Sequence, residues 1–277
     1  MPTLPSRPAA GTSSQDCRVA NIFATRPLIN TYFPIDQAMI HPAIKSLSFD
    51  AAGTLIHLAE PVGVSYASVA ARHGVTVSAD PLDRAFRTLW RRTPLPFSPD
   101  AGDSDPNERA WWSRLVCSVF AETGTFFDSA SHFEAFFTEL YDYFESPGTW
   151  LLDPAAKPLL EAVSGRYRLI VLSNFDHRLR RILGDLEVLD RFEHVILSCE
   201  ERCSKPDPRL FALAAATLGM NPGEILHLGD DPICDWAGAQ AAGFAHFRVG
   251  PPGIPRGDQG QAPLAAFLDQ LSLARPD

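Results

Sequence analysis

Apolar residues change their spacing along this chain, and the changes divide it into an opening strand, a helical segment and an alternating segment. The run Leu47-Ser48-Phe49 predicts a short buried strand that ends at Asp50. Between residues 60 and 150, apolar residues recur at the spacing of amphipathic helices. From residue 154, short apolar runs alternate with helical stretches. Such alternation is typical of a parallel sheet with helices on both faces.

The helical segment contains four amphipathic stripes, with no strand predicted between them. The residues on their apolar faces are Val62, Tyr66, Val69, Ala70 and His73, then Leu82, Ala85, Phe86 and Leu89, then Trp112, Leu115, Val116, Val119 and Phe120, and finally Phe133, Phe136, Phe137, Leu140 and Phe144. This pattern predicts a small helical bundle, with the stripes forming its core. The proline-rich loop 94–105 divides the bundle into two pairs of helices.

The alternating segment completes the predicted fold. Strands are predicted at 167–172, 195–197, 225–228 and 245–249, and helices at 155–163, at 177–183, after the N-cap Asp207, through Gly238-Ala239 and from Leu264. We therefore predict an α/β fold, a doubly wound parallel sheet with an inserted α-helical bundle cap. The predicted division is a disordered extension (1–40), a core (41–58 and 151–250), the cap (59–150), and a linker with a C-terminal helix (251–277).

Composition narrows the possible partners and the compartment. The chain has 277 residues and a formal net charge of -9, with no basic block, which argues against nucleic acid and anionic membranes. No apolar run reaches the ~18 residues of a transmembrane helix. The five cysteines are scattered, which favours reduced thiols in a cytoplasmic protein over a Cys199–Cys203 metal site. Residues 1–40 contain spread arginines, so a transit peptide is an alternative to disorder, and Met39 is an alternative start.

Polar residues of related chemistry lie at or beside the predicted strand ends. They are Asp50, Ser173, Asn174, Lys205, Asp230, Asp231 and Asp235. Ligands of such sheets bind beyond the carboxyl ends of the strands. Four carboxylates at one edge repel each other, and a hard cation such as Mg2+, which prefers oxygen ligands, relieves that repulsion. With Mg2+ and one lysine the local charge falls to about -1, so a phosphate group is able to enter.

The order of these residues resembles the haloacid dehalogenase-like hydrolase superfamily. Residues 49–55 look like its first motif, Leu172-Ser173-Asn174 like its second, 205–208 like its third, and 228–235 with the small residues of 238–243 like its fourth. The resemblance covers about residues 44–250, and the inserted helices match the type 1 cap of the family. Residues 55–63 and Tyr66 are similar to the subgroup named for a rhythmically expressed fly gene.

The resemblance implies a role for each residue at the predicted edge. Asp50 would be the nucleophile and form an aspartyl-phosphate. Mg2+ would bind Asp50, the backbone carbonyl of Ala52 and Asp230, while Asp231 or Asp235 would act through water or orient Lys205. Lys205 would stabilise the charge that develops on the transferring group. The same resemblance assigns Thr54, Ser173, Asn174 and Lys205 to the substrate site, with Ser173 and Asn174 steadying the transferring group.

Ala52 departs from the pattern of the family's phosphatases, which carry a general-acid aspartate at this position. A methyl group cannot transfer a proton, and general acid catalysis contributes about 10²–10⁴-fold. Ordinary phosphomonoesterase activity is therefore expected to be weak. His57 is a possible substitute by its proximity, although a histidine with a structural place in a hairpin or core is the simpler interpretation.

Several functions remain open. A slow Mg2+-dependent phosphatase acting on a small phosphorylated molecule is the favoured one. A 2-haloacid dehalogenase-like hydrolase would not need the acidic cluster at 230–235, and a non-catalytic phosphate and Mg2+ binder with a regulatory role would not need a nucleophile. In this family a phosphonatase would need a cap lysine, and residues 58–150 contain none, so that chemistry is excluded unless Lys157 or Lys45 reaches the site.

The cap carries basic residues that are either solvated helix-face charges or contacts for an anionic substrate. They are Arg91, Arg92, Arg109 and Arg114. We expect no nucleic-acid or membrane partner, and a monomer or a homodimer.

Overall fold

The structure is a computed structural model that describes residues 41–97, 108–250 and 262–273. The predicted extension 1–40, most of the loop 94–105 and the Pro/Gly linker at 251–260 lie outside these ranges. Within the described residues, no helix is long and apolar enough to cross a membrane. The four cysteines of the described ranges are free thiols.

A five-stranded parallel sheet forms the centre of the fold, with the strand order β5-β4-β1-β6-β7. The strands are β1 (Ser46–Phe49), β4 (Arg168–Ser173), β5 (His194–Leu197), β6 (Ile225–Gly229) and β7 (Ala245–Arg248). Phe49, the last residue of the central strand, pairs with Val171 on one side and Leu228 on the other. This register brings the carboxyl ends of the three middle strands to one edge, as the sequence pattern predicted.

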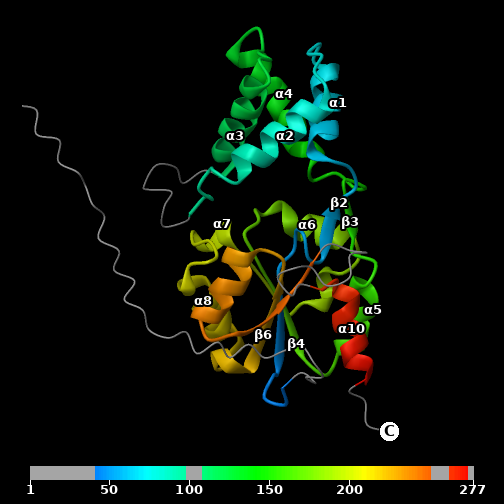
Figure 1. The fold of residues 1–277 in the computed structure, drawn as a ribbon, viewed down its shortest axis with the longest axis vertical. Coiled ribbons are helices and arrows are strands. Elements are labelled where there is room, and N and C mark those ends of the chain that lie inside the picture. Colours follow the sequence, from blue (N-terminus) through cyan, green and yellow to red (C-terminus); the bar gives the residue numbers. More distant parts are fainter. Residues whose placement is uncertain (1–40, 98–107, 251–261, 274–277) are drawn as a thin grey trace, which may run out of the picture. The chain divides into compact units, whose positions relative to one another are not determined.

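Helices cover both faces of the sheet (Figure 1). On one face α5 (Ala156–Val163), α6 (Arg178–Asp185) and α10 (Leu264–Leu273) pack against one hydrophobic cluster. On the other face α8 (Pro208–Leu218) and α9 (Gly238–Ala241) pack against a second cluster. The two faces follow from alternation along the strands: Val171 of β4 joins the first cluster and its neighbour Leu172 joins the second. The predicted doubly wound α/β fold is confirmed.

Four helices follow the first strand, and we call them the cap: α1 (Val62–Arg72), α2 (Ala79–Trp90), α3 (Glu108–Glu122) and α4 (Ala130–Tyr143). They share a hydrophobic cluster of their own, with Tyr66, Phe120 and Phe136 among its buried residues. The sequence pattern missed the two short antiparallel strands that flank the cap, β2 (Ile56–Leu58) and β3 (Trp150–Leu152). Three residues are too few for the period of a strand to show.

The remaining elements are short. They are the 3-10 helices η2 (Leu189–Arg191) and η3 (Pro222–Glu224), the single-turn helix α7 (Ser198–Glu201), and the π-helical turn η4 (Pro232–Ala237). The predicted N-cap of α8 is confirmed, because the Asp207 side chain accepts a hydrogen bond from the Arg209 backbone. The predicted helix through Gly238 is split into η4 and α9.

Candidate active site

Asp50 follows the central strand directly and is 7 % exposed. Ser173 donates a hydrogen bond to Asp50 Oδ1 at 3.0 Å, and Lys205 Nζ donates to the same oxygen at 2.7 Å. No described residue donates to Oδ2, and Asp50 lines a pocket. Burial raises the pKa of Asp50, while Lys205 opposes the rise. One carboxylate oxygen is thus held by two donors, and the other accepts no hydrogen bond from a described residue.

Lys205 is 1 % exposed and bridges two carboxylates. Its ammonium group donates to Asp50 at 2.7 Å and to Asp235 at 2.6 Å. Burial alone would lower the pKa of Lys205, but the two carboxylates outweigh it and raise the pKa above its ordinary value. Asn174 holds the Lys205 backbone from both sides, donating to its carbonyl at 2.8 Å and accepting from its N–H at 2.7 Å. The Asn174 amide therefore positions the lysine, and its predicted contact with the transferring group stays a prediction.

Asp235 lies in η4, and both of its carboxylate oxygens are hydrogen-bonded within the protein. Oδ1 contacts Lys205 and His227 Nε2, the latter at 3.0 Å, and Oδ2 accepts from the Asp231 backbone N–H at 2.9 Å. Burial alone would raise the pKa of Asp235, but Lys205 and His227 hold it below its usual range. His227 also contacts the Ser48 hydroxyl at 3.0 Å. This geometry suits a carboxylate that orients Lys205.

His227 is a residue that the sequence analysis missed. It is fully buried in β6 and pairs in register with Ser48 of β1. The available signal was a single histidine within the apolar run Ile225–Leu228. A buried polar side chain in a central strand needs a hydrogen-bond partner, and His227 contacts Asp235 in η4, the helical turn that follows β6.

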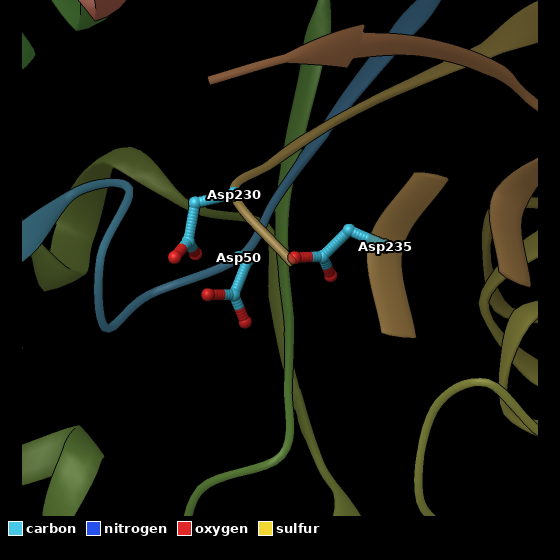
Figure 2. A group of neighbouring side chains, drawn as sticks. All are labelled: Asp50, Asp230 and Asp235. Atoms are coloured by element: carbon cyan, nitrogen blue, oxygen red, sulfur yellow. The ribbon is translucent and has the colours of Figure 1, made fainter. Parts of the chain in front are cut away.

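Three carboxylates come together at this edge: Asp50, Asp230 and Asp235 each offer an oxygen, and these oxygens lie within 4.8 Å of one another (Figure 2). Burial, with the like charges of Asp50 and Asp235, raises the pKa of Asp230 to about 8. The Thr54 hydroxyl donates to Asp230 Oδ1 across a long 3.4 Å. Thr54 therefore lies beside the carboxylate cluster, and its predicted place in the substrate site stays a prediction.

The donor set fits a hard divalent cation. Every candidate ligand atom is a carboxylate oxygen, the kind that Mg2+ and Ca2+ prefer. A cation between Asp50 and Asp230 would turn the repulsion that raises the pKa of Asp230 into attraction. Asp235 is already bonded to Lys205 and His227, so Asp50 and Asp230 are the side chains best placed to hold an ion.

Asp231 and Ala52, the other two residues predicted at the cation site, are not part of the carboxylate cluster. The Asp231 side chain caps η4, accepting from the backbone N–H groups of Ile233 and Cys234, and Asp231 is exposed. Asp231 lines the pocket but is not one of the three clustered carboxylates. Ala52 lines the same pocket as Asp50. The roles of Asp231 and of the Ala52 carbonyl as ligands stay predictions.

Gly53 makes room for the carboxylate cluster. Its φ is +92°, and a Cβ at this position would lie 2.4 Å from Asp230 Oδ2. We expect Gly53→Ala to weaken Mg2+ binding about 10-fold or more, because the Asp230 carboxylate must move away. Calorimetric titration with Mg2+ measures the effect.

Gly74→Ala is the matched control for this prediction. Gly74 has a similar φ of +75°, but a Cβ there would meet nothing within 4 Å. Both variants carry the same kind of backbone strain, and only the first disturbs the carboxylates. Equal Mg2+ affinity in the two variants would contradict the assignment of Asp230 to the cation site.

A pocket of about 1020 Å³ joins these residues to the cap. Its lining includes Asp50, Ser173, Lys205 and Asp230 from the core, together with residues of all four cap helices. The pocket is large enough for a small organic molecule that carries a phosphate.

His57 and one of the four cap arginines line the pocket. His57 lines the pocket and its Nε2 contacts Asp153 at 3.3 Å. Arg91 is the one predicted cap arginine among the residues that line this pocket. Arg109 pairs with Glu134, and Arg92 and Arg114 are exposed.

A buried ion pair connects the cap with the loop after β4, and the sequence analysis missed it. The Arg178 guanidinium pairs with Asp176, and these residues are 5 % and 1 % exposed. Arg178 also donates to the Tyr141 carbonyl of α4 at 2.9 Å and lies 3.7 Å from the centre of the Tyr141 ring. Since Asp176 is two residues beyond Asn174, the pair ties the cap to the segment that positions Lys205.

Comparison with known proteins agrees with this arrangement. Residues 44–243 match the family described as haloacid dehalogenase-like hydrolase. The human haloacid dehalogenase-like hydrolase domain-containing protein 3 is 34 % identical over 236 residues, covering 84 % of this chain and 93 % of that protein. The rhythmically expressed gene 2 protein of Drosophila melanogaster is 26 % identical over 209 residues, covering 72 % and 80 %.

Solved structures show the same fold. A predicted phosphoglycolate phosphatase from Haemophilus somnus 129PT has a TM-score of 0.58 and 20 % identity, covering 78 % of this chain and 90 % of its own. The L-2-haloacid dehalogenase from Xanthobacter autotrophicus has a TM-score of 0.58 and 22 % identity, covering 74 % and 77 %. The chain belongs to the haloacid dehalogenase-like hydrolase family, and its relatives include the rhythmically expressed gene 2 subgroup.

Proposed function

We propose that this hydrolase is a Mg2+-dependent phosphatase that transfers a phosphoryl group from a small molecule to Asp50. The proposal rests on the different hydrogen bonding of the two Asp50 carboxylate oxygens. Ser173 and Lys205 hold Oδ1, no described residue donates to Oδ2, and Asp50 and Asp230 line the same pocket. A carboxylate fixed at one oxygen presents the other to an electrophile in a defined direction.

Each residue of the site would have a distinct role in phosphoryl transfer. Asp50 Oδ2 attacks phosphorus, and the leaving-group oxygen departs with the electron pair of the broken P–O bond. Lys205, held in place by Asp235 and Asn174, stabilises the negative charge on the phosphoryl oxygens. Water then attacks phosphorus in the aspartyl-phosphate and releases inorganic phosphate and free Asp50. A Mg2+ held by Asp50 and Asp230 would supply positive charge beside the transferring group.

Ala52 limits the first step, because the leaving oxygen departs without a proton from this position. The rate should then depend on how well the leaving group carries negative charge. We expect aryl and acyl phosphates to be hydrolysed at least about 100-fold faster than alkyl phosphates, since a missing general acid is worth about 10²–10⁴-fold. Steady-state rates on 4-nitrophenyl phosphate, acetyl phosphate and glycerol 3-phosphate with Mg2+ provide the comparison. Equal rates on all three would refute the idea.

A substitution that introduces an acid at position 52 tests whether the missing general acid limits the rate. We expect Ala52→Asp to raise kcat on alkyl phosphates such as glycerol 3-phosphate by about 10-fold or more. Ala52→Asn is the matched control, because an amide has a similar shape and is not a general acid. If both variants, or neither, increase the rate while Mg2+ still binds, the deficit lies elsewhere.

The dehalogenase alternative is weaker for a physical reason. Displacement of a halide from carbon needs no cation, yet three carboxylates lie together here, two of them buried and that of Asp230 half-buried. Burial, with the like charges of Asp50 and Asp235, raises the pKa of Asp230 to about 8. That arrangement is costly without a cation to compensate it. The likeness to a dehalogenase structure at 22 % identity concerns the fold alone.

A further inference from the structure

The pocket-lining residues between Val62 and Phe144, which we call the cap face, are mainly aromatic and aliphatic. The aromatic members are Tyr66, Phe86, Trp90, Trp112, Phe137, Tyr141 and Phe144. Trp90 stacks on Phe86 at 5.8 Å and 22°, and on Trp112 at 5.7 Å and 18°. We call these three near-parallel rings of the pocket lining the aromatic platform.

Trp112 offers carbon rather than its N–H to the pocket. The residue lines the pocket, but its Nε1 has no accessible surface and no hydrogen-bond partner among the described residues. The accessible part of the indole is therefore its ring. A ligand gains contact area from this surface and no hydrogen bond.

Most polar side chains of the cap face are already bonded to the protein. Thr93 donates to the Leu89 carbonyl at 2.8 Å, and the Tyr141 hydroxyl contacts Asp176 at 3.5 Å. The Tyr66 hydroxyl makes no hydrogen bond within the described residues, although Tyr66 is 2 % exposed and lines the pocket. It remains available to one polar atom of a ligand.

The cap face also carries little net charge. Burial and the neighbouring Asp176 raise the pKa of Glu108 to about 8, so the surroundings disfavour a negative charge on this carboxyl group. Arg178 is compensated by its ion pair with Asp176. Arg91 lines the pocket and is exposed to solvent. A charged or polyhydroxylated group would therefore lose water and find few partners here.

We infer that the cap face binds a planar apolar group, so that the substrate is the phosphate of an aromatic or similarly flat compound rather than of a sugar or polyol. This inference rests on the proposed function, which places the phosphate at Asp50 and leaves the organic group against Trp90 and its neighbours. Stacking on an aromatic platform adds to the gain from burial alone.

Binding of two phosphonates tests the inference without any turnover. Benzylphosphonate and 2,3-dihydroxypropylphosphonate share a head group that cannot be hydrolysed and differ in the organic part. With Mg2+ present, we expect the benzyl compound to bind at least about 10-fold more tightly, as measured by calorimetry. Equal affinities, or tighter binding of the polyol, would overturn the inference.

Variants show whether the difference arises at the cap face. Trp90 is 38 % exposed, so Trp90→Gln should fold, and we expect it to abolish the preference for the benzyl compound. Phe126→Gln is the matched control, because Phe126 is an exposed cap aromatic outside the pocket lining and should keep the preference. A preference that survives Trp90→Gln unchanged would count against the platform.

Turnover tests the proposed phosphatase function independently of the phosphonate-binding comparison. If no phosphate ester or anhydride is hydrolysed with Mg2+, the phosphatase assignment is wrong, whatever the phosphonates show. If turnover is found but the two phosphonates bind equally, the phosphatase assignment stands and the aromatic specificity is wrong.

Discussion

The Asp50→Asn variant is expected to lose Mg2+-dependent phosphate release by about 10⁴-fold or more. An amide has nearly the shape of the carboxylate and can still meet Ser173, but it is a poor nucleophile. Lys205 keeps its second carboxylate partner, Asp235, at 2.6 Å. The fold should therefore persist, and the loss should appear in kcat. Phosphate release from 4-nitrophenyl phosphate is the measurement.

Asp128→Asn provides the control for this substitution. Asp128 lies at the start of the cap helix α4, and its side chain is 96 % exposed. The same chemical change there should leave kcat unaltered. Substantial activity in the Asp50 variant, with its melting temperature preserved, would show that another group attacks phosphorus or that water attacks it directly.

The Lys205→Met variant is expected to lose about 3–5 kcal/mol of unfolding free energy at pH 7. Methionine fills a similar volume but leaves Asp50 and Asp235 buried without their shared cation. For a protein of this size such a loss lowers the melting temperature by roughly 10 °C. Thermal unfolding without Mg2+ measures it directly, and activity should be lost as well.

The pH dependence of this loss follows from Asp235. Its pKa in the folded protein is depressed below the ordinary 3.8, so its ionised form stabilises the fold above that value. The stabilisation is lost as the pH falls through the folded pKa. The difference between the wild-type protein and the variant should thus be complete at pH 7 and shrink below about pH 4.

Lys157→Met is the surface control for the lysine substitution. The Lys157 side chain is 50 % exposed and its partner Glu187 is 82 % exposed, so this pair should contribute less than about 1 kcal/mol. A double variant, Lys205→Met with Asp235→Asn, should recover part of the loss because it removes one uncompensated charge. A Lys205→Met protein as stable as the Lys157→Met protein would contradict the buried bridge.

Much of the fold could be predicted because the strands and helices leave local patterns. A polar residue after an apolar run, such as Asp50 or Asp230, marks the end of a buried strand wherever the sheet is assembled. The parallel order then brings those ends to one edge of the sheet, so the proximity of Asp50 to Lys205 and Asp235 on the adjoining segments could be predicted. The carboxylate cluster is a consequence of topology.

The parts that the sequence analysis missed depend on contacts between distant segments. The Arg178–Asp176 pair becomes meaningful only when the carbonyl of Tyr141 in α4 lies beside it. The detailed tasks of Asn174 and Asp231 also required the structure, because their side chains bond the backbone of the loop at Lys205 and of η4. Neither spacing nor composition indicates which backbone group such a side chain will meet.

The most direct test of the account is to identify the residue that accepts the phosphoryl group. The protein is mixed with 4-nitrophenyl phosphate and Mg2+, quenched in acid within one turnover and digested, and its peptides are examined by mass spectrometry. The account predicts one added phosphoryl group on the peptide that contains Asp50, absent without Mg2+ and absent in Asp50→Asn. A phosphoryl group on a different residue, or nitrophenol release with an unmodified Asp50 throughout the first turnover, would contradict it.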